Sequence, residues 1–109
     1  MSKYIESYST ELMRFEEPFV YISFTDFSAG RGLMQIHSDW GSYSYYWGAM
    51  GEDTPIKKFV ASCDAGYIHT KLKSCVNYQD MKKDAQRRLD HFMIQCWPAI
   101  HEKLKQDDP

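Results

Sequence analysis

The chain has 109 residues, of which 43% are hydrophobic and 16% aromatic, and its net charge is -2. This length predicts a single domain over residues 1–109, and the aromatic content excludes a disordered chain. No apolar run approaches the roughly 18–20 residues that span a bilayer, and residues 1–6 lack the apolar stretch of a secretory signal, so we expect a cytoplasmic protein without a membrane partner.

Three strand-like segments follow one another in the first half of the chain: Phe19–Phe27, Leu33–Trp40 and Tyr43–Trp47. Short turns rich in glycine and serine, at residues 28–32 and 41–42, predict that they form an antiparallel meander. Within the first strand, Val20, Ile22 and Phe24 share one face, while Phe19, Tyr21 and Ser23 share the other. The segment Tyr4–Phe15 adds a fourth strand or begins as a helix.

The second half of the chain has helical signals. Thr54 is placed as an N-cap before Pro55, and residues 64–66 interrupt the helix that follows. Asn77 can cap a last, long helix that Pro98 must end or kink. Its apolar residues recur at steps of three and four, at Met81, Ala85, Leu89, Phe92, Met93, Cys96 and Ile100. The fold class is therefore α+β, with three or four strands followed by C-terminal helices on one sheet face.

The densest feature is the aromatic segment from Trp40 to Trp47. These rings either fill the core or form a binding surface, because Tyr and Trp are enriched at interface hot spots. The sheet face away from the helices should carry several of Phe19, Tyr21, Tyr43, Tyr45 and Trp47.

Charge is distributed unevenly. Residues 1–54 carry 3 basic and 8 acidic side chains, whereas residues 55–76 carry four lysines against one aspartate. The acidic half makes nucleic acid an unlikely ligand there and suits a partner with a basic surface.

Candidate catalytic groups are sparse. His37 and Asp39 would share a strand face, and Cys63, Asp64 and His69 lie close in sequence, but neither set has a recognisable nucleophile context. The three cysteines are expected to be free thiols, and the four histidines have no metal-ligand spacing. Arg31 lies between two glycines in a hairpin turn, not in a phosphate-binding loop. We therefore expect no catalytic residue, metal or cofactor.

Residues 19–72 resemble a group of small phage and prophage proteins. The likeness rests on three blocks: Asp26–Ile36 with its Gly-rich turn, Tyr43–Gly51 with its Tyr-Trp-Gly sequence, and Ile56–Leu72 with its Cys-Asp helix end. The resemblance implies a bacteriophage origin and action in the host cytoplasm. It supplies no activity and no catalytic residues.

Three hypotheses follow. The first is a non-enzymatic phage protein that binds and inhibits a host protein, with a CRISPR–Cas component or another nucleic-acid-binding defence complex as the first candidate. The second is a nucleotide or nucleic-acid binding module that uses Arg31, Lys57 and Lys58 for phosphate, and the third is a small enzyme that uses Cys63 or His37. Exposed aromatic residues would also permit a homodimer. The residues expected to contact the partner are Asp26, Asp39, Tyr43, Tyr45, Trp47 and Arg31.

Overall fold

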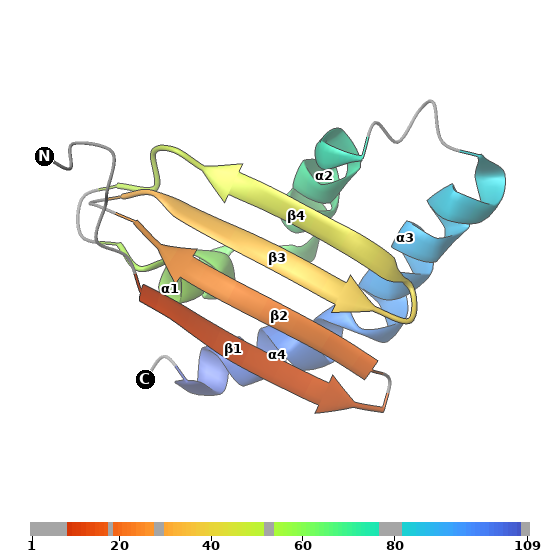
Figure 1. Cartoon of the computed structure of the whole chain (residues 1–109), viewed down its shortest axis with the longest axis horizontal. Coiled ribbons are helices and arrows are strands. Elements are labelled where there is room, and N and C mark those ends of the chain that lie inside the picture. Colours follow the sequence, from red (N-terminus) through yellow and green to blue (C-terminus); the bar gives the residue numbers. More distant parts are fainter. Residues whose placement is uncertain (1–8, 18, 28–29, 52–53, 77–81, 108–109) are drawn as a thin grey trace, which may run out of the picture.

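One antiparallel sheet, with helices on a single face, makes up the protein (Figure 1). The structure is a computed structural model, and it describes residues 9–17, 19–27, 30–51, 54–76 and 82–107. The strands are β1 (Ser9–Glu16), β2 (Phe19–Asp26), β3 (Gly32–Ser38) and β4 (Gly41–Trp47). Each strand pairs with its neighbour in the chain, in the order β1-β2-β3-β4. The predicted α+β meander is confirmed.

The segment Tyr4–Phe15, which the sequence assigned to either a strand or a helix, forms a strand from Ser9 onward. The residues before Ser9 lie outside the described part of the chain. Its Met13 pairs with Ile22 of β2, which pairs in turn with Ile36 of β3. All three side chains are buried. The predicted alternation in β2 is therefore confirmed, since Val20, Ile22 and Phe24 are all buried whereas Tyr21 is exposed.

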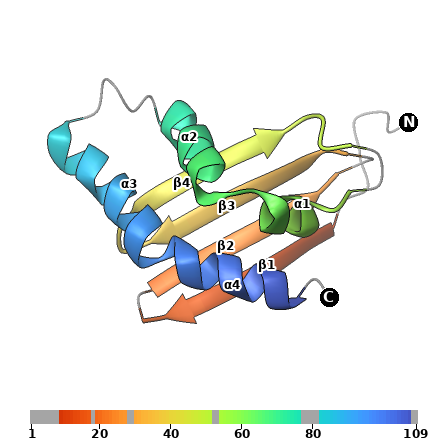
Figure 2. The same ribbon diagram turned by 180° about the vertical axis from the view of Figure 1, so that it is seen from behind.

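Four helices cover the apolar face of the sheet, which Figure 2 shows from behind. They are α1 (Ile56–Ser62), α2 (Ala65–Cys75), α3 (Lys83–Gln95) and α4 (Trp97–Asp107). Helix α1 packs on β2 and β3, while α2 packs on β4. The core between the layers contains Phe24, Met34, Ile56, Ile68, Leu72, Phe92 and Trp97. Within the described residues, this packing leaves the opposite sheet face without a helix.

The expected N-cap of α1 is wrong. Thr54 does not cap this helix, because the cap position falls on Pro55, whose side chain makes no cap hydrogen bond. Asp26 takes over this role from the end of β2, and its carboxylate accepts a 2.7 Å hydrogen bond from the backbone N–H of Ile56. The first turn of α1 is thus anchored to the sheet by a contact distant in sequence.

Substituting Asp26 by Ala is expected to lower the free energy of unfolding by about 1 kcal/mol, because it removes the acceptor for a helix N-terminal N–H. Asp26→Asn keeps an acceptor oxygen and should cost less. Chemical denaturation of both variants tests this prediction. Equal losses would show that the charge of Asp26, rather than its hydrogen bond, stabilises α1.

The predicted breaks at residues 64–66 and at Pro98 are confirmed, but α3 begins at Lys83, later than a cap at Asn77 would place its start. Asp64 caps α2, since its carboxylate accepts a 2.7 Å hydrogen bond from the N–H of Tyr67. Helix α3 ends at Gln95 and α4 begins at Trp97, so Pro98 stands at the predicted break. The apolar stripe is buried at Leu89, Phe92, Met93, Cys96 and Ile100. The predicted cap Asn77 and the stripe residue Met81 lie outside the described residues.

The hairpin between β3 and β4 turns earlier than expected. Strand β3 ends at Ser38, and Asp39 and Trp40 form the turn that the sequence placed at residues 41–42. The Ser38 hydroxyl stabilises this turn, because it donates to the carbonyl of Gly41 and accepts from the N–H of Trp40. Asp39 therefore does not share a strand face with His37.

Candidate functional site

The uncovered sheet face is the main candidate site. It is called the open face here, and its residues come from all four strands: Thr10, Leu12, Arg14, Glu16, Phe19, Tyr21, Ser23, Leu33, Gln35, His37, Ser42, Ser44 and Tyr46. Leu12, Tyr21 and Tyr46 are 59%, 43% and 46% exposed, and all three lie on this one face. The open face therefore offers apolar area to a partner.

Cross-strand pairing arranges this face in rows. A polar row of Ser23, Gln35 and Ser44 crosses β2, β3 and β4, with Leu12 at its β1 end. Aromatic residues flank that row on both sides: Tyr21 pairs with His37 in one neighbouring row, and Tyr46 pairs with Leu33 in the other. The arrangement combines apolar rings with a few polar groups, which is typical of protein recognition surfaces.

A shallow groove lies in the open face. Its volume is about 350 Å³, and it is lined by Leu12, Tyr21, Ser23, Gln35, Ile36 and His37. The ring of Phe19 stacks on Tyr21 with centroids 6.3 Å apart and meets His37 edge-on at 6.2 Å. These contacts hold the Tyr21 and His37 rings beside the groove.

His37 lies on the open face and is hydrogen-bonded to a hydroxyl. Its Nδ1 lies 2.8 Å from Oγ of Ser42, which faces it across the strand pair. The expected partner Asp39 is in the turn instead. The pair of His37 and Ser42 is exposed, and among the described residues no carboxylate orients the imidazole. This arrangement can donate or accept hydrogen bonds to a ligand.

Tyr43, Tyr45 and Trp47 lie on the helix side of β4, not on the open face. Tyr43 and Trp47 are buried, and their rings contact Phe92 at 5.6 Å and Phe59 at 5.6 Å, respectively. The expectation that these rings would be on the outward face is wrong for this reason. Only Phe19 and Tyr21 of the expected outward set are on the open face.

The acidic residues of the first half that the structure describes do not gather into one face. Glu11 pairs with Lys57 at 3.1 Å and Glu16 pairs with Arg14 at 2.9 Å, while Asp26 caps α1. Asp39 is exposed in the β3–β4 turn. The expected acidic surface is therefore divided among separate local contacts, and the open face is nearly neutral.

The proposed phosphate contacts lie on α1, which carries Lys57 and Lys58, and in the β2–β3 turn, which carries Arg31. Lys57, on α1, is engaged by Glu11 and lies 3.6 Å from Asp107 of α4. Arg31 is half-buried in the turn between β2 and β3, where its carbonyl accepts a hydrogen bond from the N–H of Phe27. These positions do not form one cationic surface with the open face.

The cysteine and histidine candidates are separated in the same way. Cys63 donates to the carbonyl of Phe59 at 3.2 Å, whereas Nε2 of His69 donates to the Asp90 carboxylate at 3.0 Å. His101 donates to the carbonyl of Ala61 at 2.9 Å. In the described part of the chain, no three metal-ligating side chains come together.

The described thiols are poor nucleophiles. Cys63 and Cys96 are both free. Burial raises the pKa of the Cys63 thiol, and the neighbouring Asp64 carboxylate raises this pKa further. Burial likewise raises the pKa of the Cys96 thiol, with a smaller contribution from Asp39. A raised pKa lowers the thiolate fraction at neutral pH, which is the opposite of an activated cysteine.

Alkylation of Cys63 and Cys96 in the folded protein at pH 7–8 is expected to be several-fold slower than that of a free cysteine peptide. The rate should still be rising above pH 9, since only the thiolate reacts. Peptide mapping by mass spectrometry after timed iodoacetamide treatment measures each site. Faster reaction of Cys63 than of the free peptide would contradict this prediction.

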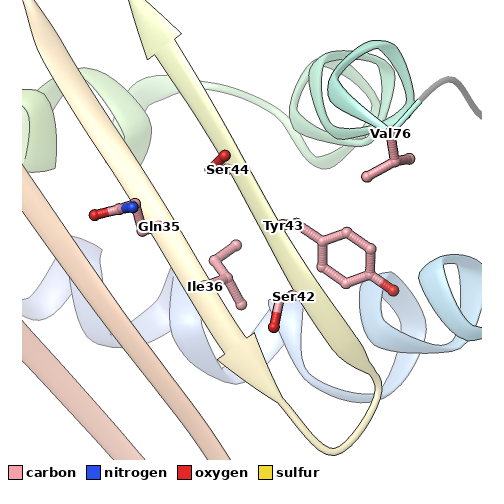
Figure 3. A pocket seen from close by; sticks show the side chains of 6 residues that line it. All are labelled: Gln35, Ile36, Ser42, Tyr43, Ser44 and Val76. Atoms are coloured by element: carbon pink, nitrogen blue, oxygen red, sulfur yellow. The ribbon is translucent and has the colours of Figure 1, made fainter.

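Two further hollows are found, and the smaller one shares Gln35, Ser42 and Ser44 with the open face. One, of about 510 Å³, is lined by residues of α2 and α3, including His69, Asp90, Met93 and Ile94. The other, of about 280 Å³, adjoins β4 and the end of α2 (Figure 3). It is lined by Gln35, Ile36, Ser42, Tyr43, Ser44 and Val76.

Comparison with known proteins places the chain among phage proteins. The model of a phage family, Phage_phiTE_072, matches residues 3–106, nearly the whole chain. The chain belongs to this phage family. The match confirms the phage character that the resemblance implied and extends it to both ends of the chain. No curated protein and no solved structure matches. Within the described residues, no helix is long and apolar enough to cross a membrane.

The sequence interpretation missed Leu12 and Tyr46 as surface residues. A signal for Tyr46 exists, because Ser42 and Ser44 precede it at steps of two and mark a polar strand face. Leu12 carried no such signal, since the structure of its segment was not assigned.

Proposed function

We propose that this phage protein is non-enzymatic and acts in the host cytoplasm by binding a host protein through its open face. The observation that carries the proposal is the set of exposed apolar side chains, Leu12, Tyr21 and Tyr46, on a sheet face without a helix. Exposed apolar area of this kind marks interaction surfaces.

The chemistry of the described residues favours binding over catalysis. His37 and Ser42 are bonded to each other on an open surface, and the described thiols have raised pKa values. A reacting carbonyl would need hydrogen-bond donors aimed at its oxygen and a site closed to water. The shallow groove beside Tyr21 is better suited to the side chain of a partner.

We further propose that the host protein belongs to an anti-phage defence system, with a CRISPR–Cas component as the first candidate. Family membership supports this narrower proposal, because a phage protein meets its targets inside a bacterium. The acidic side chains described in the first half are divided among local contacts, so apolar contact replaces charge as the basis of the proposal.

The first experiment is a pull-down with the tagged protein from lysate of a host bacterium, with and without nuclease, followed by mass spectrometry. A stoichiometric protein partner that survives nuclease is expected. Partners that vanish with nuclease would favour the nucleic-acid module instead. That outcome is disfavoured because Arg14, a cation of the open face, is paired with Glu16.

The narrower proposal needs its own experiment. Expression of the chain in cells whose CRISPR–Cas system targets a test phage is expected to restore plaque formation. Unchanged interference across the systems tested, together with a partner in the pull-down, would refute the defence target and leave the binding function intact.

A further inference from the structure

The two edges of the sheet differ in charge. Edge strand β1 carries Glu11, Arg14 and Glu16 among its eight residues, whereas β4, Gly41–Trp47, carries no charged residue among its seven. Charged side chains on an edge strand discourage pairing with another strand. In the described part of the chain, no further strand pairs with the outer edge of β4. This edge is therefore the one suited to accept a strand.

Helix α2 lies beside that edge. It packs against β4 on the helix side of the sheet, and its C-terminal end projects past the edge of the strand (Figures 1 and 2). The hollow of about 280 Å³ lies at this edge and is lined from both sides of the sheet, by Gln35, Ser42 and Ser44 as well as by Ile36, Tyr43 and Val76. Figure 3 shows the ring of Tyr43 and the side chain of Val76 beyond the strand. A strand added to β4 would place one of its side chains in this hollow.

A lysine lies next along the same side of the edge. Nζ of Lys71, from α2, lies 5.4 Å from the ring centre of Tyr45 and 5.2 Å from that of Tyr67. Among the described residues, no carboxylate forms an ion pair with Lys71. Lys71 can therefore receive an acidic group from a ligand at this position.

We propose that β4 accepts an extended segment of a partner protein as a fifth strand. Tyr43 and Tyr45 are two residues apart and share a face, so the segment carries an apolar side chain beside Tyr43 and Val76 and an acidic side chain two positions away, beside Lys71. Backbone hydrogen bonds along β4 supply the pairing, and these two side chains supply the selectivity.

A second copy of the chain does not fit this edge. Strand β4 carries no charged residue, so the β4 strand of a second copy would offer no acidic side chain to Lys71. A segment of a different protein can supply that acidic side chain.

The probe for this inference is a displayed library of random dodecapeptides, selected on the full-length protein. We expect enriched peptides to alternate, with an apolar and an acidic residue two positions apart. They should shift the backbone amide resonances of residues 41–47 in NMR spectra. N-methylation of a selected peptide should abolish binding at every second position, because alternate N–H groups of the added strand face β4.

Lys71→Glu is expected to weaken the selected peptides about tenfold and, in a repeated selection, to replace their acidic residue by a basic one. Lys105→Glu, the same charge change at an exposed site on α4, is the control and should leave binding unchanged. The inference is overturned if no peptide is enriched, if the shifts fall on β1 and β2, or if Lys71→Glu has no effect.

The inference deepens the proposed function and rests on it, since the ligand is taken to be a protein segment. The two can fail separately. Peptides that bind β4 while Leu12→Asp leaves the host partner bound would remove the open face from the proposal and leave the edge site standing. If no peptide binds β4 while Leu12→Asp abolishes binding of the host partner, the edge site alone is refuted.

Discussion

Replacing Leu12 by Asp is expected to weaken binding of the host partner tenfold or more. Leu12 is 59% exposed and lines the groove beside Tyr21, so an aspartate there places a desolvated charge inside the proposed contact. Its side chain is not part of the buried core, so folding should be little affected. Titration of the purified partner by calorimetry measures the change in affinity.

Ile94→Asp is the matched control for this substitution. Ile94 is also an exposed aliphatic residue, at 67%, but it lies on α3 on the other side of the molecule. It should leave partner affinity unchanged. If Leu12→Asp binds as tightly as the wild type, the open face is not the contact surface. Loss of binding in Ile94→Asp alone would make the α2–α3 hollow, which Ile94 lines, the candidate.

Gly30→Ala is expected to destabilise the fold by about 2–4 kcal/mol. Gly30 has a φ of +76°, which side chains rarely adopt, and an added Cβ would lie 2.7 Å from the carbonyl oxygen of Gly51. The carbonyl of Gly30 also accepts a 2.7 Å hydrogen bond from the N–H of Met50. Strain and a backbone clash therefore act together at the point where the β2–β3 turn meets the segment after β4. Thermal unfolding should show a fall in Tm of about 10 °C or more.

Gly48→Ala provides the comparison. At Gly48 the nearest atom to an added Cβ is 3.5 Å away, an ordinary van der Waals contact. Its effect should stay within about 0.5 kcal/mol. A similar loss in both variants would mean that the positive φ and the close approach at Gly30 do not set the cost, since the smaller freedom of Ala in the unfolded chain by itself favours folding.

Much of the fold can be predicted from the sequence because its signals are local. Alternation along residues 19–24 places Tyr21 opposite Val20 and Ile22, and the structure confirms this. Asp64 and Pro98 mark helix ends through their own backbone chemistry. These signals do not depend on what the rest of the chain does.

The predictions are wrong where residues distant in the sequence determine the local structure. Thr54 has the composition of an N-cap, but Asp26 reaches the first turn of α1 from thirty residues away in the sequence. The aromatic residues of β4 occupy both of its faces, so their identity does not show which face the helices cover. The serines at 42 and 44 indicate the polar face, and Phe92 and Phe59 from the helices bury Tyr43 and Trp47.

The candidate site was predicted in part. Tyr21 and Phe19 were expected on the outward face and are there, while Leu12 and Tyr46 were not foreseen. Asp26 was expected to contact the partner. In the structure its carboxylate accepts a hydrogen bond from the N–H of Ile56. The role of any of these residues in binding a partner stays a prediction until the affinity measurements are made.

The strand order has a consequence for how the chain folds. Each strand pairs with the strand beside it in the sequence, so the sheet grows by hairpins, which close in about 1–10 μs in isolation. Helix α4, by contrast, must reach back to α1, where His101 bonds to Ala61 and Asp107 approaches Lys57. During synthesis the strands emerge before the helices, so the apolar side of the new sheet is exposed to water until α1 and α2 pack on it. Because α4 is the last element of the chain, its contact with α1 is the last of these that synthesis can complete.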